Sequence, residues 1–323
     1  MGSDISPKPL VSVVIPTRLR PELAKAIDSA QRQQDVGTVE IVVVIDAAHA
    51  IASPTDHVTE KLNRARVLVL EGGQGAAAAR NEGVQMASGE WIAFLDDDDE
   101  WNDRHLAAAL EEAGRHDMDV LVATRAVQVV EGRPLSVPTP ARPKRVDESV
   151  GDYLFRRRSP SVGRASLFTS TLVVRRSIAL RVPWQHGLRR HQDWGWLLRL
   201  EEAGVSTAQA SAVTTRIWVG SDSSISASAD WESSLDWARR RRSSLSRHAY
   251  TDFLVAQSLR YAIQARSWRG VRTVAGEIVH CRALPWPGAL LFAVGALVPR
   301  RAAFRFLAAS RSILRKVGFH ASS

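Results

Sequence analysis

The stretch Trp91-Ile-Ala-Phe-Leu-Asp-Asp-Asp-Asp-Glu-Trp101 places four consecutive carboxylates directly after a short apolar run. Like charges crowded together repel, and burying them costs free energy unless a positive charge is present. One interpretation is a solvated turn in which Asp99 or Asp103 caps the next helix. The other is a divalent-cation site, with Asp96 and Asp98 pointing the same way and Asp97 elsewhere. This stretch alone does not decide between them.

Apolar runs like Trp91–Leu95 recur along the first half of the chain, with helical patterns between them. Further strands are expected at Val11–Ile15, Glu40–Ile45, Arg66–Leu70 and from Val120. Helices are expected from Pro21 to about Gln33, after the glycine-rich loop Gly72–Gly75, and from Asp103 to about Arg115. Because the strands lack in/out alternation, they predict an α/β fold: a mainly parallel, Rossmann-like sheet with helices on both faces.

The second half of the chain has a less regular pattern. Prolines and polar residues over 132–147 predict a loop or linker. A strand is expected at Ser170–Val174, a helix from His191 to about Ala203, and strand and loop over 207–219. From Trp231 onward the pattern is helical and basic.

Polar residues follow several of the predicted strands at the point where each strand ends. Thr17, Asp46, the loop Gly72–Gly75 and the acidic run all stand in this position. In open α/β folds the loops after parallel strands gather at the carboxyl edge of the sheet, where ligands bind. We therefore expect these residues to converge on one crevice.

Four motifs occur in a fixed order: VSVVIPTR from Val11, EIVVVIDAA from Glu40, GQGAAAARNEG from Gly73 and FLDDDDEW from Phe94. Together they resemble the family 2 glycosyltransferases, which have the nucleotide-sugar-binding type A fold. The resemblance extends from residue 10 to about 205. It implies a glycosyltransferase catalytic domain over residues 1–225, followed by a helical, basic C-terminal region over 226–323.

The resemblance also implies roles for individual residues on the donor side. Asp46 would hydrogen-bond the nucleotide base, with Pro16 and Thr17 lining the same pocket. Arg80 and Asn81 would support the nucleotide. The acidic run would supply Asp96 to ribose or metal, Asp97 to the nucleotide side, and Asp98 to an Mn²⁺ or Mg²⁺ that bridges the diphosphate. The family often has Asp-Gly-Ser after its second strand, whereas Ala47 and Ala48 follow Asp46 here, which leaves the base and its contacts open.

The segment His191-Gln-Asp-Trp-Gly-Trp196 resembles the family's Glu-Asp motif under the acceptor site, with Gln192 in place of the glutamate. Asp193 would then be the general base that accepts the proton of the acceptor hydroxyl, and one-step displacement would invert the anomeric centre. The alternative is that Asp193 is only a favourable anion at a helix N-terminus. Of the nearby tryptophans 184, 194, 196 and 218, at least two are expected to pack in the core.

Composition limits the classes of protein that fit. The chain has 323 residues, 45% of them apolar, and a single cysteine, Cys281, so it cannot form an internal disulfide. Its opening, MGSDISPKPL, is polar and has no signal-peptide pattern, so we expect a cytoplasmic protein. Residues 1–150 carry 16 Lys and Arg against 24 Asp and Glu, whereas residues 151–323 carry 27 against 10. This asymmetry predicts an anionic partner for the second half.

The basic C-terminal region suggests what that partner is. The apolar run Ala289–Val298 is too short to span a bilayer, and residues 299–307 interleave aromatics with arginines. Peripheral binding to an anionic membrane surface, on the inner face of the cell membrane, fits a lipid-linked or glycan acceptor. The alternative is a helical subdomain with an exposed arginine face.

Other functions remain open at this stage. A nucleotidyltransferase also combines an α/β sheet with paired aspartates, but it would want a basic, glycine-rich loop after the first strand, where Pro16-Thr-Arg-Leu-Arg20 has no glycine. A dinucleotide-dependent oxidoreductase would place its glycine loop after the first strand, not the third. A non-enzymatic nucleic-acid-binding protein would use the basic half, but no nucleic-acid module is recognisable, so nucleic acid is not the expected partner.

Overall fold

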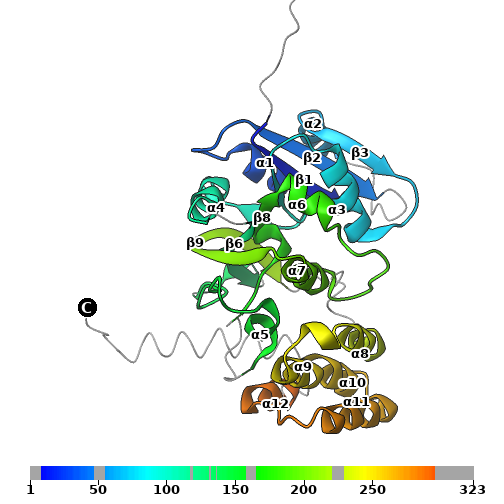
Figure 1. Ribbon diagram of the computed structural model, residues 1–323. Helices are drawn as coiled ribbons and strands as arrows, with labels where there is room; N and C mark the ends of the chain where they lie inside the picture. The colour runs from blue at the N-terminus through cyan, green and yellow to red at the C-terminus, as the bar shows by residue number, and fades with distance from the viewer. Residues whose placement is uncertain are drawn as a thin grey trace, which may run out of the picture. The chain divides into compact units, whose positions relative to one another are not determined.

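The computed structural model describes residues 9–46, 55–116, 119–130, 132–135, 137–157, 165–219 and 229–294 (Figure 1). The chain divides into two compact units. The first comprises Met1–Gln128, Pro138–Val150 and Ala165–Trp218, and the second comprises Val129–Val137, Gly151–Arg164 and Val219–Ser323. The predicted boundary at residue 225 lies outside the described residues.

A nine-stranded sheet forms the framework of the described chain, in the order β3-β2-β1-β4-β8-β6-β9-β5, with β7 beside β6. Its parallel part consists of β3 (Arg66–Leu70), β2 (Val39–Asp46), β1 (Val11–Thr17) and β4 (Trp91–Phe94). The remaining strands are β5 (Glu100–Trp101), β6 (Val120–Val130), β7 (Arg133–Pro134), β8 (Leu172–Arg175) and β9 (Ser206–Val219). The pairs β4–β8, β6–β8, β6–β7 and β5–β9 are antiparallel.

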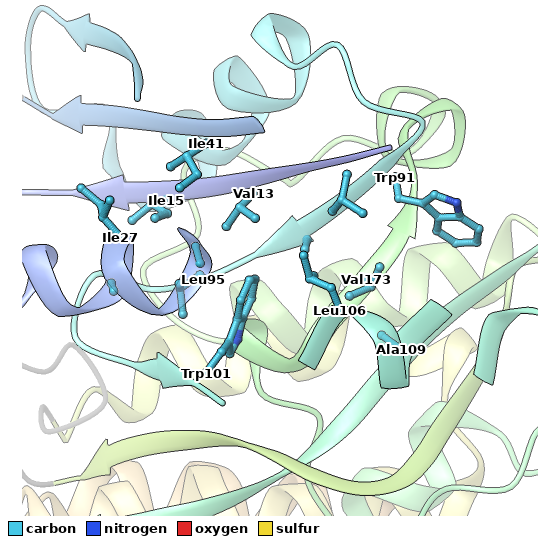
Figure 2. Packing of buried hydrophobic residues seen from close by; sticks show 14 of the residues in the cluster. Val13, Ile15, Ile27, Ile41, Trp91, Leu95, Trp101, Leu106, Ala109 and Val173 are labelled. Carbon is cyan, nitrogen blue, oxygen red and sulfur yellow. The ribbon is translucent and has the colours of Figure 1, made fainter. Parts of the chain in front are cut away.

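One face of the sheet is covered by α1 (Leu23–Gln31) and α4 (His105–Ala113). Alternate residues of β1, such as Val13 and Ile15, point into this layer because successive side chains of a strand lie on opposite faces. Figure 2 shows them packed with Ile27 and with Leu106, and all four side chains are fully buried.

The opposite face is covered by α3 (Gly75–Met86) and α6 (Arg176–Arg181). Gly83 lets α3 approach closely, since a Cβ at this position would stand 2.4 Å from Val14 Cγ1 and 3.2 Å from Val44 Cγ2. The same unit also contains α2 (Asp56–Leu62), capped by the Thr55 hydroxyl, and α7 (Gln192–Glu202).

The second unit is helical in its C-terminal part. It contains α8 (Trp231–Arg240), α9 (Arg247–Phe253), a π-helical segment η5 (Leu254–Leu259), α10 (Arg260–Gln264), α11 (Trp268–His280) and α12 (Pro287–Val294). The elements α9, η5 and α10 follow one another without a break, and α8, α11 and α12 all pack against η5. Phe155, at the end of α5 (Val150–Phe155), meets Phe253 edge-on with ring centroids 5.1 Å apart.

The predicted fold class is confirmed: an α/β protein with a mixed sheet, parallel over β3-β2-β1-β4 and flanked by helices, and a helical C-terminal region. Two details were wrong or missed. Residues 207–219 are one continuous strand rather than strand and loop, and the segment 132–147 contains β7 and a bridge between Ala126 and Thr139. Among the described helices, none is both long and apolar enough to cross a bilayer.

Candidate functional site

The carboxyl edge of the parallel strands gathers the polar residues that follow them. β1 lies between β2 and β4, so Thr17, Asp46 and the start of the acidic run share this edge. Thr17 Oγ1 donates to Asp97 Oδ2 at 2.7 Å, which joins the ends of β1 and β4 directly. The predicted convergence of these segments is therefore present in the fold.

The first three aspartates of the run each have a basic or hydroxyl partner. Arg80 Nη2 donates to Asp96 Oδ1 at 2.5 Å. Arg20 Nη1 donates to Asp98 Oδ2 at 2.8 Å and lies 3.4 Å from Asp97 Oδ1. The two guanidinium groups supply the positive charge that such crowded carboxylates require.

Asp99 has a structural environment instead. It is 5% exposed, and it accepts from Ser170 Oγ at 2.5 Å and from the Trp218 backbone N–H at 3.2 Å. Burial is the main reason why the pKa of Asp99 stands well above its usual value. Asp97 is also buried, so the interpretation of this stretch as a solvated turn is wrong. The N-cap of α4 is Arg104, neither Asp99 nor Asp103.

Asp98 is partly exposed and has an electrostatic environment that favours a bound cation. Burial, followed by the charges of Asp96 and Asp97, raises the pKa of Asp98 to about 6 despite the nearby Arg20. A cation at this position would relieve the repulsion that the raised pKa reflects.

The carboxylate oxygen atoms available as ligands fit Mg²⁺ or Mn²⁺. The side chains of Asp96 and Asp98 are 33% and 28% exposed, and they offer the hard oxygen atoms that these ions prefer. Within the described ranges, no three His, Cys, Asp or Glu side chains gather closely enough to hold a metal by themselves. Such a site suits an ion that takes its remaining ligands from water and phosphate.

Asp46 fixes the glycine-rich loop at the same edge. The backbone N–H of Gly75 donates to Asp46 Oδ2 at 3.0 Å, and Gly75 has φ of +80°, a left-handed conformation that favours glycine. Pro16 is buried inside β1 opposite Val44. The residues Ala47 and Ala48, where the sequence departs from the family pattern, lie outside the described residues.

Arg80 and Asn81 stand next to each other in α3 and point to different partners. The Arg80 guanidinium reaches the acidic run and lies 4.7 Å from the centroid of the Trp184 ring. Asn81 holds the backbone of Trp184 at both ends, accepting from its N–H at 2.7 Å and donating to its carbonyl at 2.9 Å. Asn81 thereby anchors the segment that leads to α7.

Asp193 lies in the first turn of α7 and is partly exposed. Burial is the largest contribution to the raised pKa of Asp193, the Arg80 charge lowers it, and the Asp96 charge raises it. The predicted base is therefore within electrostatic range of the acidic run. The residue before α7 is strained, because His191 is held at φ 59°, and its ring stacks on Trp194 with centroids 4.7 Å apart.

Two of the four tryptophans near this region are core residues, as expected. Trp184 and Trp196 are 2% and 0% exposed and stack on each other with ring centroids 4.3 Å apart. Trp218 is 40% exposed. The buried pair also packs against Arg80, because the Trp184 ring contacts the guanidinium of that residue.

Sequence reasoning missed two residues that organise the acidic run. Arg20 pairs with Asp97 and Asp98, and Ser170 bonds both the Asp96 backbone N–H and Asp99. Arg20 follows the first predicted strand, so its charge at this edge was a usable signal. Ser170 carried no such signal, because it lies in the short 3₁₀ helix Thr169–Thr171, 71 residues from Asp99 along the chain.

Comparison with known proteins agrees with this geometry. The amylovoran biosynthesis glycosyltransferase AmsB of Erwinia amylovora is 26% identical over 200 residues, which cover 60% of this chain and 64% of AmsB. The putative colanic acid biosynthesis glycosyl transferase WcaA of Escherichia coli K12 is 37% identical over 105 residues, 32% of this chain and 37% of WcaA. The chain thus spans less than two thirds of these curated relatives.

Solved structures show the same fold. A crystal structure of S. aureus TarS 1–349 in complex with UDP-GlcNAc matches with a TM-score of 0.58 and 15% identity, covering 96% of this chain and 93% of that one. The model of the glycosyl transferase family 2 matches residues 12–179, more than half of the chain, which include the acidic run and its partners Arg20 and Arg80. The chain belongs to glycosyl transferase family 2.

Proposed function

We propose that the protein transfers a sugar from a nucleotide-diphosphate sugar to an acceptor hydroxyl, with inversion, in the synthesis of a cell-surface polysaccharide or glycoconjugate. Membership of family 2 supports glycosyl transfer. The named relatives in amylovoran and colanic acid biosynthesis support the polysaccharide context, and the UDP-GlcNAc bound to TarS supports a nucleotide-sugar donor.

The donor nucleotide lies at the carboxyl edge of the parallel strands in this proposal. Asp46 bonds the base, Pro16 and Thr17 line the pocket, and Arg80 and Asn81 hold the nucleotide side of the site through α3. Mn²⁺ or Mg²⁺ held by Asp96 and Asp98 would neutralise the charge that develops on the leaving diphosphate. Asp97 fixes the acidic run through its bond to Thr17 Oγ1.

Asp193 acts as the general base on the acceptor side. One carboxylate oxygen of Asp193 accepts the proton of the acceptor hydroxyl. At the same time the hydroxyl oxygen attacks the anomeric carbon from the face opposite the diphosphate. The attack inverts the anomeric centre, because bond formation and departure of the diphosphate take place on opposite faces in one step.

The observation that carries the proposal is the proximity of Asp193 to the donor edge. The charges of Arg80 and Asp96 both act on Asp193, although the three residues come from α3, the end of β4 and α7. A residue serving only as a helix-terminal anion would not need to lie within electrostatic range of the acidic run. A base and a diphosphate site must face each other across the transferred sugar.

The test is donor turnover by the wild type and by Asp193→Asn, with UDP-, GDP- and dTDP-sugars and a panel of glycan acceptors. The wild type should release one nucleoside diphosphate in step with glycoside formation, and proton NMR of the product should show the inverted anomeric signal. The asparagine variant should bind the same donor but lose at least about a hundredfold in turnover. A folded variant with wild-type turnover would refute the role of Asp193.

A further inference from the structure

The helices α11 and α12 present apolar side chains to solvent. On α11, Trp268 is 81% exposed and Val279 is 76% exposed, whereas Gly270 and Val274, on the other face, are buried against the rest of the unit. Trp268 and Val279 are eleven residues apart, which is about three helical turns, so they share one face of the helix.

The solvent-facing side of α12 is apolar as well. Ala289 and Ala293 pack against Val255 of η5, while Leu290 and Leu291 are 48% and 56% exposed. Val294 is 60% exposed, and Leu284, in the connection between α11 and α12, is 87% exposed. A soluble surface rarely leaves this much large apolar side chain uncovered without a partner.

Both helices pack on η5, and Ile278 of α11 lies against the cluster formed by Val255, Ala289 and Ala293. We call the exposed apolar side chains of this region the apolar face; they are Trp268, Val279, Leu284, Leu290, Leu291 and Val294.

Positive charge accompanies the apolar face. Residues 266–294 contain four arginines, at positions 266, 269, 272 and 282, and all four are exposed. The segment has one acidic residue, Glu277, and its carboxylate is engaged by Arg239 at 2.7 Å and by the Tyr250 hydroxyl at 3.1 Å. The electrostatic potential around the apolar face is therefore positive.

We propose that the apolar face docks this protein onto an anionic lipid bilayer, with the leucines and Trp268 entering the interface and the arginines contacting lipid phosphates. The combination of an apolar face, flanking cations and an exposed tryptophan is that of an interfacial, non-spanning membrane helix. This surface lies beyond the proposed transfer reaction and is independent of it.

Charge favours an anionic bilayer over two alternative partners, which are a second copy of the chain and the chain's own residues 295–323. A second copy docking through the same face would set four arginines against four arginines, because a two-fold interface is self-complementary. The chain's own residues 295–323 carry six Lys and Arg and no Asp or Glu, so covering the face with them would also bring like charges together. An anionic bilayer matches both the apolar side chains and the arginines.

The experiment is cosedimentation of the full chain with vesicles of phosphatidylcholine, with or without phosphatidylglycerol, at low and high salt. The variants are Leu290→Ser with Leu291→Ser, and Arg269→Gln with Arg272→Gln. Val69→Ser, on β3 in the other unit, is the matched control because Val69 is 54% exposed. Thermal unfolding checks that each variant is folded, and UDP, GDP and dTDP titrations check that its nucleotide binding matches that of the wild type.

The wild type and the Val69 variant should bind phosphatidylglycerol vesicles and lose binding in high salt. The leucine variant should lose at least about tenfold in partition coefficient, because two of the inserting apolar groups are gone. Subtracting the emission spectrum of Trp268→Phe from that of the wild type gives the contribution of Trp268. This contribution should shift to shorter wavelength when the protein binds vesicles. The proposal would be overturned if the leucine variant bound vesicles as well as the wild type does, or if neither the wild type nor any variant bound them. It would also be overturned if the wild type self-associated without binding vesicles and the leucine variant did not self-associate.

Discussion

Four adjacent aspartates meet four different environments at the end of β4. Asp96 bonds Arg80, Asp97 bonds Thr17, Asp98 bonds Arg20, and Asp99 is buried against Ser170. Their sequence is uniform, so their individual roles come from partners up to 80 residues away along the chain. The sequence located the cluster but could not separate the buried Asp97 and Asp99 from the partly exposed Asp96 and Asp98.

The two interpretations of Asp193 predict opposite changes in stability. Burial raises the folded-state pKa of Asp193 above its unfolded value, so ionisation at neutral pH disfavours the folded state. Asp193→Asn should therefore raise Tm at pH 7. The difference in Tm between the variant and the wild type should become smaller as the pH falls toward the ordinary pKa range of aspartate. If Asp193 only stabilised the N-terminus of α7, the same variant would lower Tm at pH 7.

The same raised pKa fixes the pH dependence of catalysis. The base must be ionised, so transfer should fall as pH drops through the folded-state pKa of Asp193. The acidic limb of kcat/KM should accordingly lie above the ordinary aspartate value of about 3.9. A limb at or below that value, measured with the donor identified by the turnover assay, would remove Asp193 from the role of base.

Arg20 supplies charge to the acidic run in the absence of a metal. In chelator, Arg20→Gln should lower stability by about 1–3 kcal/mol, because Asp97 and Asp98 lose a shared, mostly buried partner. Added Mn²⁺ should recover more Tm in this variant than in the wild type. Arg145→Gln is the control, since Arg145 pairs with Asp147 at an exposed site. Equal losses in both variants would show that Arg20 has no special role.

At the scale of elements, the parallel pairing was predictable and the antiparallel pairing was not, although the sequence did indicate strands where β6, β8 and β9 lie. The runs that form β1, β2 and β4 are mostly apolar because both faces of the sheet are covered there, whereas β3, at the edge, exposes Val67 and Val69. The direction in which β8 pairs with β4 depends on the path of the chain between them and leaves no periodic signal. The helices α2 and α6 have seven and six residues, too short for a reliable helical period.

The packing of α3 on the sheet makes a prediction with a built-in control. Gly83→Ala should cost about 1–3 kcal/mol, because its Cβ would stand 2.4 Å from Val14 Cγ1 in a close-packed layer. Gly276→Ala, in α11, meets nothing within 4 Å and should stabilise by about 0.5–1 kcal/mol. Urea unfolding of both variants measures the difference, and a neutral Gly83→Ala would contradict the close approach of α3.

At the scale of the whole molecule, the charge asymmetry of the sequence matches a division of roles. The half that contains the parallel strands and the acidic run is net acidic, and the half that contains the C-terminal helices is strongly basic. Composition predicted an anionic partner for the basic half, but the exposure of Trp268 and Leu284 required the structure. Residues 295–323, which lie outside the described residues, add six Lys and Arg and no Asp or Glu to that region.

The central claim is that the acidic run holds a divalent cation against a nucleotide diphosphate. Calorimetric titration of UDP, GDP and dTDP, with Mn²⁺ or with chelator, tests it on the wild type, on Asp98→Asn and on Asp103→Asn as an exposed control. We predict that one nucleotide binds only with metal, and that binding survives in the Asp103 variant but is lost in the Asp98 variant. Failure of all three nucleotides to bind the folded wild type, or equal binding by the Asp98 variant, would contradict the account.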